Sequence, residues 1–136
     1  LSANRVTDVN ALSQLSQLRT LRLTDNSIEN VEPLAGLVDL TELRLGSNRI
    51  ENVVPLAGLG HVRVLDLNEN SISDISSLKA LPRLEVLRLA ENNLMELDAL
   101  LTLPALRIVE VWGNPLSATA LQHVETLRKR GVEVQN

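Results

Sequence analysis

The segment LTELRLGSNRIENVVPLAGL, residues 40–59, decides the fold, because its pattern recurs along almost the whole chain. Its apolar frame consists of Leu40, Leu43, Leu45, Ile50, Val53, Leu56 and Leu59. The same frame fills residues 18–37, 62–81 and 84–103, and a fifth copy begins at Leu106. Intervals of 22 residues also separate six asparagines: Asn4, Asn26, Asn48, Asn70, Asn92 and Asn114. Internal periods of roughly 20 to 50 residues are typical of solenoids, so the sequence predicts an α/β solenoid.

Each repeat is predicted to contain one strand and one short return segment. Leu21 and Leu23 alternate with polar residues, and this period of two indicates a half-buried strand. Equivalent positions predict parallel strands centred near residues 21, 43, 65, 87 and 109. After each asparagine the apolar residues recur at every third position, which suits short 3₁₀ turns better than an α-helix. Pro33 and Pro55 in this part would also break an ordinary helix.

The repeated asparagines are interpreted as a structural ladder. An unpaired buried amide costs roughly 1 to 3 kcal/mol, so a column of unpaired asparagines would strongly destabilise a small protein. Each side chain carries both donors and an acceptor. We therefore expect these amides to bond the backbone where the chain leaves each strand, and we disfavour the alternative of a ligand-binding asparagine row. The ladder comprises Asn26, Asn48, Asn70, Asn92 and Asn114.

The pattern L-x-x-L-x-L-x-x-N-x-L, present at residues 40–50 with Ile50 in place of the last leucine, resembles the leucine-rich-repeat superfamily. The resemblance is to its 22-residue class, which includes bacterial internalin-type adhesins and a eukaryotic phosphatase-regulator branch, and residues 31–45 look most similar to the bacterial members. It implies a right-handed curved horseshoe with a parallel sheet on the concave face, short 3₁₀ or turn segments on the convex face and a C-terminal cap helix. It also implies a protein-binding role.

The C-terminal segment, residues 117–136, is expected to cap the repeats. Ser117 is predicted to be the N-cap of a helix near residues 118–130, with Leu116 and Leu121 at the hydrophobic-staple positions. Leu121, Val124 and Leu127 would line its buried face. Gly131 would adopt the left-handed conformation that ends the helix, and residues 132–134 alternate as a final strand.

Three basic residues, Arg128, Lys129 and Arg130, close this helix. Cations in the last turn oppose the helix dipole. We therefore favour a solvated helix end over a nucleic-acid-binding patch. The closing segment also resembles the cap of many bacterial leucine-rich-repeat proteins.

The first residues of the chain form only a partial repeat, residues 1–17, which precedes the repeats at 18–116. Leu1 aligns with Leu23, inside an expected strand, so we expect the sequence to be part of a longer chain with one leucine-rich-repeat domain at 1–136. Four apolar residues are expected near an open repeat face: Val6, Val9, Leu12 and Leu15. Such a face predicts self-association.

Composition excludes several classes of protein. The sequence has 136 residues, 44% of them apolar, and no cysteine, which excludes disulfides, thiol catalysis and thiolate metal sites. The sequence contains no run of 18 apolar residues, so no membrane span is predicted. The net charge of −4 opposes nucleic-acid binding, which requires a basic surface. Trp112 is the only aromatic residue, so no platform for stacking bases is predicted.

No motif predicts catalysis, a cofactor or a metal site. His61 and His123 lack neighbours at ligand or catalytic-triad spacing, and both are expected at the surface. The carboxylates of Glu42, Asp66 and Glu110 alternate with arginines on the strand face, so we expect them to be solvated or paired rather than poised as general acids. Phosphate-binding, zinc-protease and serine-hydrolase motifs are absent. The protein is therefore predicted not to be an enzyme.

The outward residues of the strands predict a binding surface on the concave sheet. They fall into three columns, which are Thr20, Glu42, Val64, Val86 and Ile108; Arg22, Arg44, Asp66, Arg88 and Glu110; and Thr24, Gly46, Asn68, Ala90 and Trp112. Apolar members gather in the C-terminal half, and exposed apolar clusters rimmed by charge mark interaction sites. The predicted contact residues are Trp112, Ile108, Val86, Arg88, Val64, Arg44, Asp66 and Glu110. The alternatives are that the β-branched residues simply favour strands and that Trp112 packs beneath the cap.

The sequence therefore predicts a non-catalytic module that binds an unidentified protein through the concave sheet. The resemblance favours an extracellular or cell-surface protein of a bacterium. A cytoplasmic regulatory scaffold and a structural spacer or oligomerisation segment are the alternatives.

Overall fold

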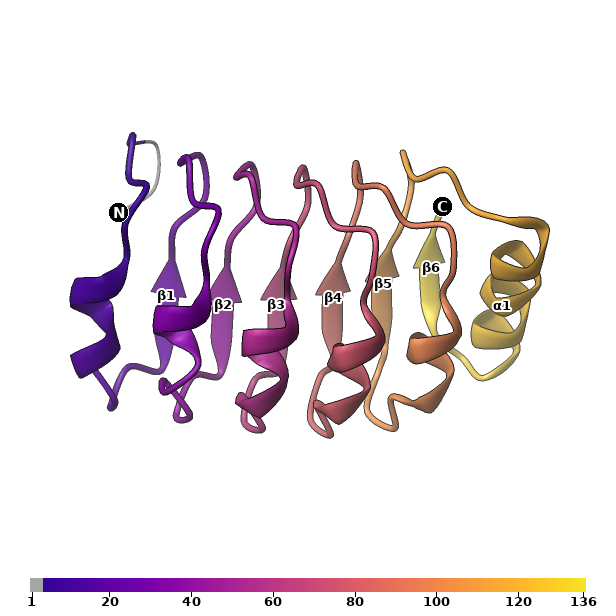
Figure 1. Ribbon diagram of the computed structural model, residues 1–136. Helices are drawn as coiled ribbons and strands as arrows, with labels where there is room; N and C mark the ends of the chain where they lie inside the picture. The colour runs from indigo at the N-terminus through magenta and orange to yellow at the C-terminus, as the bar shows by residue number, and fades with distance from the viewer. Residues whose placement is uncertain (1–3) are drawn as a thin grey trace.

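The computed structural model describes residues 4–136, which form a solenoid with a single six-stranded parallel sheet along one face (Figure 1). The strands follow one another in chain order across the sheet, as the 22-residue period predicts. Their bounds are β1 Thr20–Arg22, β2 Glu42–Arg44, β3 Val64–Asp66, β4 Val86–Arg88, β5 Ile108–Glu110 and β6 Glu133–Gln135. The pairing is in register, since Leu21 aligns with Leu43 and Leu43 with Leu65. The predicted strand centres are therefore confirmed.

Short 3₁₀ segments form the opposite, convex face, as predicted (Figure 1). They are η1 Asn10–Gln14, η2 Glu32–Leu34, η3 Val54–Gly58, η4 Ser76–Ala80 and η5 Asp98–Thr102. Pro33 and Pro55 lie in the first turn of η2 and η3, where a missing N–H has no consequence. Between sheet and 3₁₀ segments, the leucine frame is buried, and Leu43, Leu45 and Leu56 are each 0% exposed.

The 3₁₀ segments begin with a second periodic contact that the sequence analysis did not single out. Two residues before each of η1 to η4, a side-chain oxygen accepts a hydrogen bond from the first backbone N–H of the segment. The acceptors are Asp8, Asn30, Asn52 and Asp74. This is the Asx-turn geometry that Asn and Asp favour. The Ser76 N–H that bonds Asp74 also lowers the pKa of that carboxyl.

The asparagine ladder is present and joins successive repeats. The side-chain oxygen of Asn70 accepts from Ile50 N at 2.9 Å, one repeat earlier. Its amide donates to Leu45 O, Leu67 O and Asn68 O at 3.0 to 3.1 Å. Equivalent bonds form at the other ladder positions, which are Asn26, Asn48, Asn92 and Asn114. The residue before each of Asn26, Asn48, Asn70 and Asn92 has a positive φ between 53° and 56°, and Gly113 takes this place before Asn114.

The C-terminal cap consists of α1 Ala118–Lys129 followed by β6. Ser117 is the N-cap, because its hydroxyl accepts from Ala120 N at 3.0 Å, and Gly131 has φ 85°, as predicted. The prediction for Leu121 was wrong: this side chain is 46% exposed, and Ala120 is buried instead. The helix turns by about 100° per residue. Residues 120, 124 and 127 therefore share the buried face, and Leu121 lies beside it.

The basic residues at the end of α1 bond the protein's own backbone. Arg130 donates to Leu101 O and Leu103 O, at 2.6 and 3.1 Å, at the C-terminal end of η5. Arg128 donates to Val134 O at 3.0 Å and pairs with Glu125. The Arg130 contacts attach the cap to the last full repeat, and the Arg128 contacts join α1 to β6 within the cap. Two of the three basic residues therefore have a structural role.

The first described residues pack against the repeat that follows. Val9 is 3% exposed, Val6 and Leu12 are half-buried, and Leu15 is 48% exposed. The expected open apolar face is therefore partly present, around Leu15. The predicted alignment of Leu1 falls outside the described residues.

Candidate functional site

The candidate site is the outward face of the parallel sheet, to which each strand contributes side chains at positions one and three of its three residues. Register places Val64 beside Val86 and Val86 beside Ile108. These three side chains are half-buried and form a continuous apolar column across β3 to β5. The same register places Asp66 beside Arg88 and Arg88 beside Glu110. The sheet therefore brings the predicted contact residues onto one face.

Ion pairs fix the charged column at both ends of this face. Glu42 accepts from Arg22 at 3.1 Å and from Arg44 at 2.7 Å. The hydrogen bond from Arg22, followed by that from Arg44, lowers the pKa of the Glu42 carboxyl despite its partial burial. Glu42 thus remains ionised and paired, as predicted, and holds two neighbouring guanidinium groups.

The second ion-pair network lies in the C-terminal half. Arg88 donates to Glu110 at 2.9 Å, and Asn68 donates to the other carboxylate oxygen at 3.1 Å. The Asn68 oxygen accepts from Ala90 N at 2.8 Å. The Glu110 side chain is only 16% exposed. This network therefore orders the polar side chains beside the apolar column, while Asp66 accepts from Asn68 N at 3.2 Å.

The third column contains the exposed aromatic residue and one correction. Trp112 is 43% exposed, so the cap does not enclose it. Ala90, expected to contribute to the exposed apolar cluster, is 0% exposed. Its small side chain lies in the column between the larger Asn68 and Trp112, which explains why solvent does not reach it. The apolar surface therefore consists of the Val64, Val86 and Ile108 column together with Trp112.

A recess of about 380 Å³ opens at the apolar column between β4 and the cap. It is lined by Val86 and Ile108 and by four residues that the sequence analysis did not select: Glu85, Arg107, Gly131 and Glu133. Glu85 and Arg107 each immediately precede a strand. The side of the sheet on which the strands begin, which we call the strand-start edge, therefore contributes to the site.

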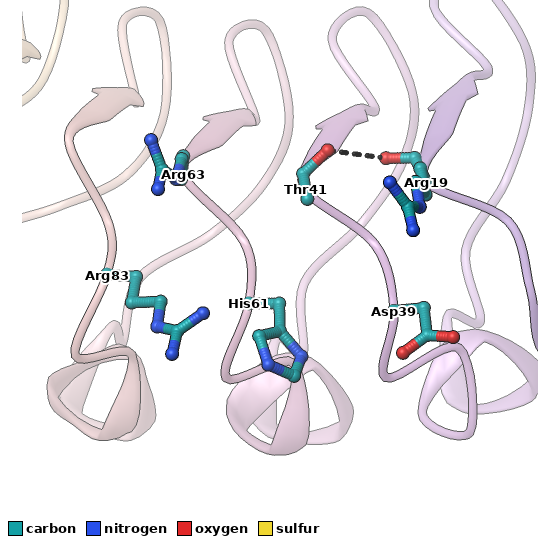
Figure 2. Close-up of a pocket in the computed structure, with 6 residues that line it drawn as sticks. All are labelled: Arg19, Asp39, Thr41, His61, Arg63 and Arg83. Carbon is teal, nitrogen blue, oxygen red and sulfur yellow. Dashed lines mark hydrogen bonds between the residues drawn. The ribbon is translucent and has the colours of Figure 1, made fainter.

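A second recess lies along the same edge, beneath the N-terminal half of the sheet (Figure 2). It is lined by Arg19, Asp39, Thr41, His61, Arg63 and Arg83. The sequence analysis missed this cluster because it considered only the strand residues. The signal was nonetheless periodic, since positions 19, 41 and 63 and positions 39, 61 and 83 each recur at 22 residues.

The histidines and acidic residues of the described part of the chain are not clustered as metal ligands. Within residues 4–136, no group of three or more His, Cys, Asp or Glu side chains is arranged to hold a metal ion. His61 is exposed, with Nδ1 3.0 Å from Val38 O. His123 is half-buried rather than at the surface as expected, and its buried Nδ1 has no hydrogen-bond partner in the described part of the chain. Across the same residues, no helix has both the length and the apolar character needed to cross a bilayer.

Comparison with known proteins gives matches for both sequence and fold. A family profile described as leucine rich repeat matches residues 39–94, and one described as leucine rich repeats (2 copies) matches residues 16–58. No curated protein sequence matches the chain.

Three solved bacterial structures resemble the chain. An internalin (inlF) from Listeria monocytogenes is 26% identical with a TM-score of 0.91, over 99% of this chain and 39% of that one. Internalin C2 from the same species is 37% identical with a TM-score of 0.85, over 88% of this chain and 53% of that one. A leucine-rich-repeat protein from Leptospira interrogans is 21% identical with a TM-score of 0.73, over 98% and 41%, which shows a common fold alone. The chain thus spans about half or less of each of these proteins.

Proposed function

Since the chain belongs to the leucine-rich-repeat superfamily, whose members typically bind proteins and are not catalysts, we propose that it is a protein-binding module that uses the concave sheet. The contact surface would comprise the apolar column, Trp112 and the flanking charged residues. In this proposal Trp112, Ile108, Val86 and Val64 provide the apolar contacts, and Arg88, Glu110, Arg44 and Asp66 orient the partner.

The observation that carries the proposal is the exposure of Trp112 beside an ordered charged network. Tryptophan and arginine are enriched among the residues that dominate binding energies. The pairs Arg44–Glu42 and Arg88–Glu110 are already formed. A partner would therefore meet side chains that lose little additional conformational freedom on binding.

Trp112 is expected to make the largest single contribution. At 43% exposure, roughly 100 Å² of its surface remains to be buried by a partner, worth about 2 to 3 kcal/mol at ~25 cal/mol per Å². An exposed ion pair contributes about 1 kcal/mol or less. We therefore expect Trp112→Ala to weaken binding by roughly 30- to 150-fold and Arg22→Ala by less than about fivefold.

The test begins by selecting a ligand for the immobilised chain from a displayed library of protein domains. The affinity of the purified ligand is then measured by calorimetry for the wild type, Trp112→Ala and Arg22→Ala. Val54→Ala is the matched control, because Val54 is 62% exposed in η3 on the convex face. Melting is recorded for every variant. If Trp112→Ala lowers the melting temperature and leaves affinity unchanged, Trp112 serves the cap and the proposal loses its anchor.

We further propose that the module acts at the surface of a bacterium or outside it. The similarity to two Listeria internalins supports this location. The alternatives are a cytoplasmic regulatory scaffold and a spacer or oligomerisation segment. The flanking coding sequence discriminates among them, because a secretion leader upstream supports the surface location. A fused catalytic or GTPase domain would instead favour the scaffold.

A further inference from the structure

The recess beneath the N-terminal half of the sheet has a volume of about 330 Å³ and lies outside the proposed concave contact surface (Figure 2). Its six lining residues come from three successive repeats, two from each. Arg19, Thr41 and Arg63 each immediately precede a strand, and Asp39, His61 and Arg83 each lie three positions before a strand. We call these six residues the basic recess.

Positive charge predominates in the basic recess, although the whole chain has a net charge of −4. Three guanidinium groups face one carboxylate, that of Asp39. Within residues 4–136, Arg19 and Arg83 form no ion pair. Arg63 lies 3.4 Å from Glu85, and its side chain is 61% exposed. Arginine charge concentrated in a hollow raises the local concentration of anions.

The guanidinium groups of Arg19 and Arg83 are the unpaired donors of the recess among the described residues, and that of Arg63 has one partner, Glu85. Thr41 already donates its hydroxyl hydrogen to Arg19 O at 3.0 Å. The Nδ1 atom of His61 lies 3.0 Å from Val38 O, and because a carbonyl only accepts, Nδ1 carries the proton in neutral His61. The planar guanidinium fork matches a carboxylate or phosphate with two parallel hydrogen bonds. The recess is therefore suited to oxyanions.

We propose that the basic recess binds an acidic protein segment that carries at least two carboxylates. Neighbouring parallel strands lie about 4.8 Å apart, so Arg19 and Arg63 start roughly 10 Å apart, two repeats from each other. Figure 2 shows the guanidinium groups of Arg19, Arg63 and Arg83 separated rather than converging on one point. This spacing matches carboxylates distributed along an extended segment better than a single phosphate.

Other polyanions fit the recess less well. A nucleic acid would meet a chain of net negative charge. Its bases could not stack on an aromatic side chain at the recess, because Trp112, the one aromatic residue, lies in the third column of the concave face. An acidic protein segment, in contrast, can continue from a partner on the sheet, because Thr41 and Arg63 adjoin the first residues of β2 and β3. The inference thus extends the proposed function, but it requires only the recess.

The probe is an acetylated, amidated hexaglutamate peptide, with hexaglutamine as the uncharged comparison. Each is titrated into the ¹⁵N-labelled chain at low ionic strength, and amide shifts are followed by NMR. Shifts are expected around residues 39–41 and 61–63 with hexaglutamate alone. The double variant Arg63→Gln, Arg83→Gln should weaken binding roughly fivefold or more, since each exposed ion pair contributes up to about a factor of five.

Arg49→Gln is the matched control, because Arg49 is an exposed arginine outside the recess. Its side chain is 67% exposed and lies 3.9 Å from the Glu29 carboxylate. Arg49→Gln should leave hexaglutamate binding unchanged. Trp112→Ala should also leave it unchanged, which distinguishes failure of the concave-face proposal from failure of the basic-recess proposal. Circular dichroism checks that the double variant folds.

Three results would overturn the proposal. The first is equal binding of hexaglutamate by the double variant and by Arg49→Gln, and the second is equal binding of hexaglutamine. The third is a higher affinity, measured from the shifts of the same amides, for inorganic phosphate or for a thymidine oligonucleotide than for hexaglutamate. The former would assign the recess to a small anion and the latter to a nucleic acid.

Discussion

At the scale of single residues, the ladder asparagines connect each repeat to the one before it. Asn70 illustrates the consequence, because its side chain makes bonds to three carbonyls and to Ile50 N. Truncation to Ala would leave the Ile50 N–H without its partner, whereas each of the three carbonyls keeps a second donor. An unsatisfied buried group costs about 1 to 3 kcal/mol. The fold therefore depends on asparagine side chains that the sequence reveals only by their 22-residue spacing.

We predict that Asn70→Ala lowers the free energy of unfolding by more than about 1 kcal/mol. Urea denaturation followed by circular dichroism measures the change. Asn93→Ala is the control, because Asn93 is an exposed asparagine in the equivalent loop of the next repeat and should change the midpoint little. Identical midpoints for Asn70→Ala and wild type would contradict the structural role of the ladder.

Glu42 provides a residue-scale prediction about pH. Its two hydrogen-bonded arginines lower its folded pKa below the ordinary value of 4.5. The ionised side chain therefore stabilises the fold above about pH 4.5, and this contribution is lost as pH falls through the lowered folded pKa. Glu42→Gln should cost no more than about 1 kcal/mol at pH 7, because both arginines are partly exposed.

The measurement is the difference in unfolding free energy between Glu42→Gln and wild type, from pH 7 down to the acid limit of folding. The difference should shrink as pH decreases below 4.5. Glu29→Gln serves as the control, since Glu29 is 72% exposed and 3.9 Å from its arginine. A difference that stays constant with pH would show that the ion pairs are not its cause.

At the scale of elements, the 3₁₀ segments differ in how they begin. Segments η1 to η4 each follow an Asp or Asn that accepts the first N–H. Before η5 the equivalent residue is Glu96, whose longer side chain makes no such bond among the described residues. One cap of this class is worth about 1 kcal/mol. Segment η5 thus lacks the side-chain hydrogen bond that precedes each of η1 to η4.

We predict that Glu96→Asn stabilises the protein by up to about 1 kcal/mol by supplying the missing cap. This should raise the melting temperature by roughly 3 °C, as observed by calorimetry. Asp74→Ala removes the corresponding bond before η4 and should lower the melting temperature by a similar amount. If Glu96→Asn leaves melting unchanged while Asp74→Ala lowers it, η5 does not use this cap.

At the scale of the whole molecule, the two ends of the solenoid differ. Helix α1 and β6 cover the last repeat, and Arg130 attaches α1 to η5. At the other end, Leu15 is 48% exposed, and a hollow of about 440 Å³ is lined by residues 14–18. Leu15 and Leu18 are the apolar residues of this hollow, and exposed apolar side chains favour contact with another such surface.

We predict that the 136-residue chain self-associates weakly through this end. Analytical ultracentrifugation should show an average mass that rises with concentration, and Leu15→Lys should abolish the rise. Met95→Lys is the control, because Met95 is a similarly exposed residue, at 59%, in a later repeat. A monomer across a wide concentration range would exclude this contact, as would an equal effect of both variants.

The fold was predictable because its determinants recur within the sequence itself. Strand positions follow from the alternation around Leu21 and Leu23, and the ladder follows from the 22-residue spacing. The N-cap Ser117 and the left-handed Gly131 were also predictable, because capping depends on residues within one or two turns. In each case the interacting groups lie close together in the sequence or belong to neighbouring repeats.

The sequence by itself therefore determined the solenoid, the inward residues and the columns of the sheet. Only the tertiary structure decided which outward residues remain exposed, because exposure depends on the size of neighbours contributed by adjacent repeats. Ala90 is enclosed whereas Trp112 is not, and Leu121 lies beside the buried helical face. The basic recess likewise forms from residues of three repeats, whose side chains meet only when the repeats stack.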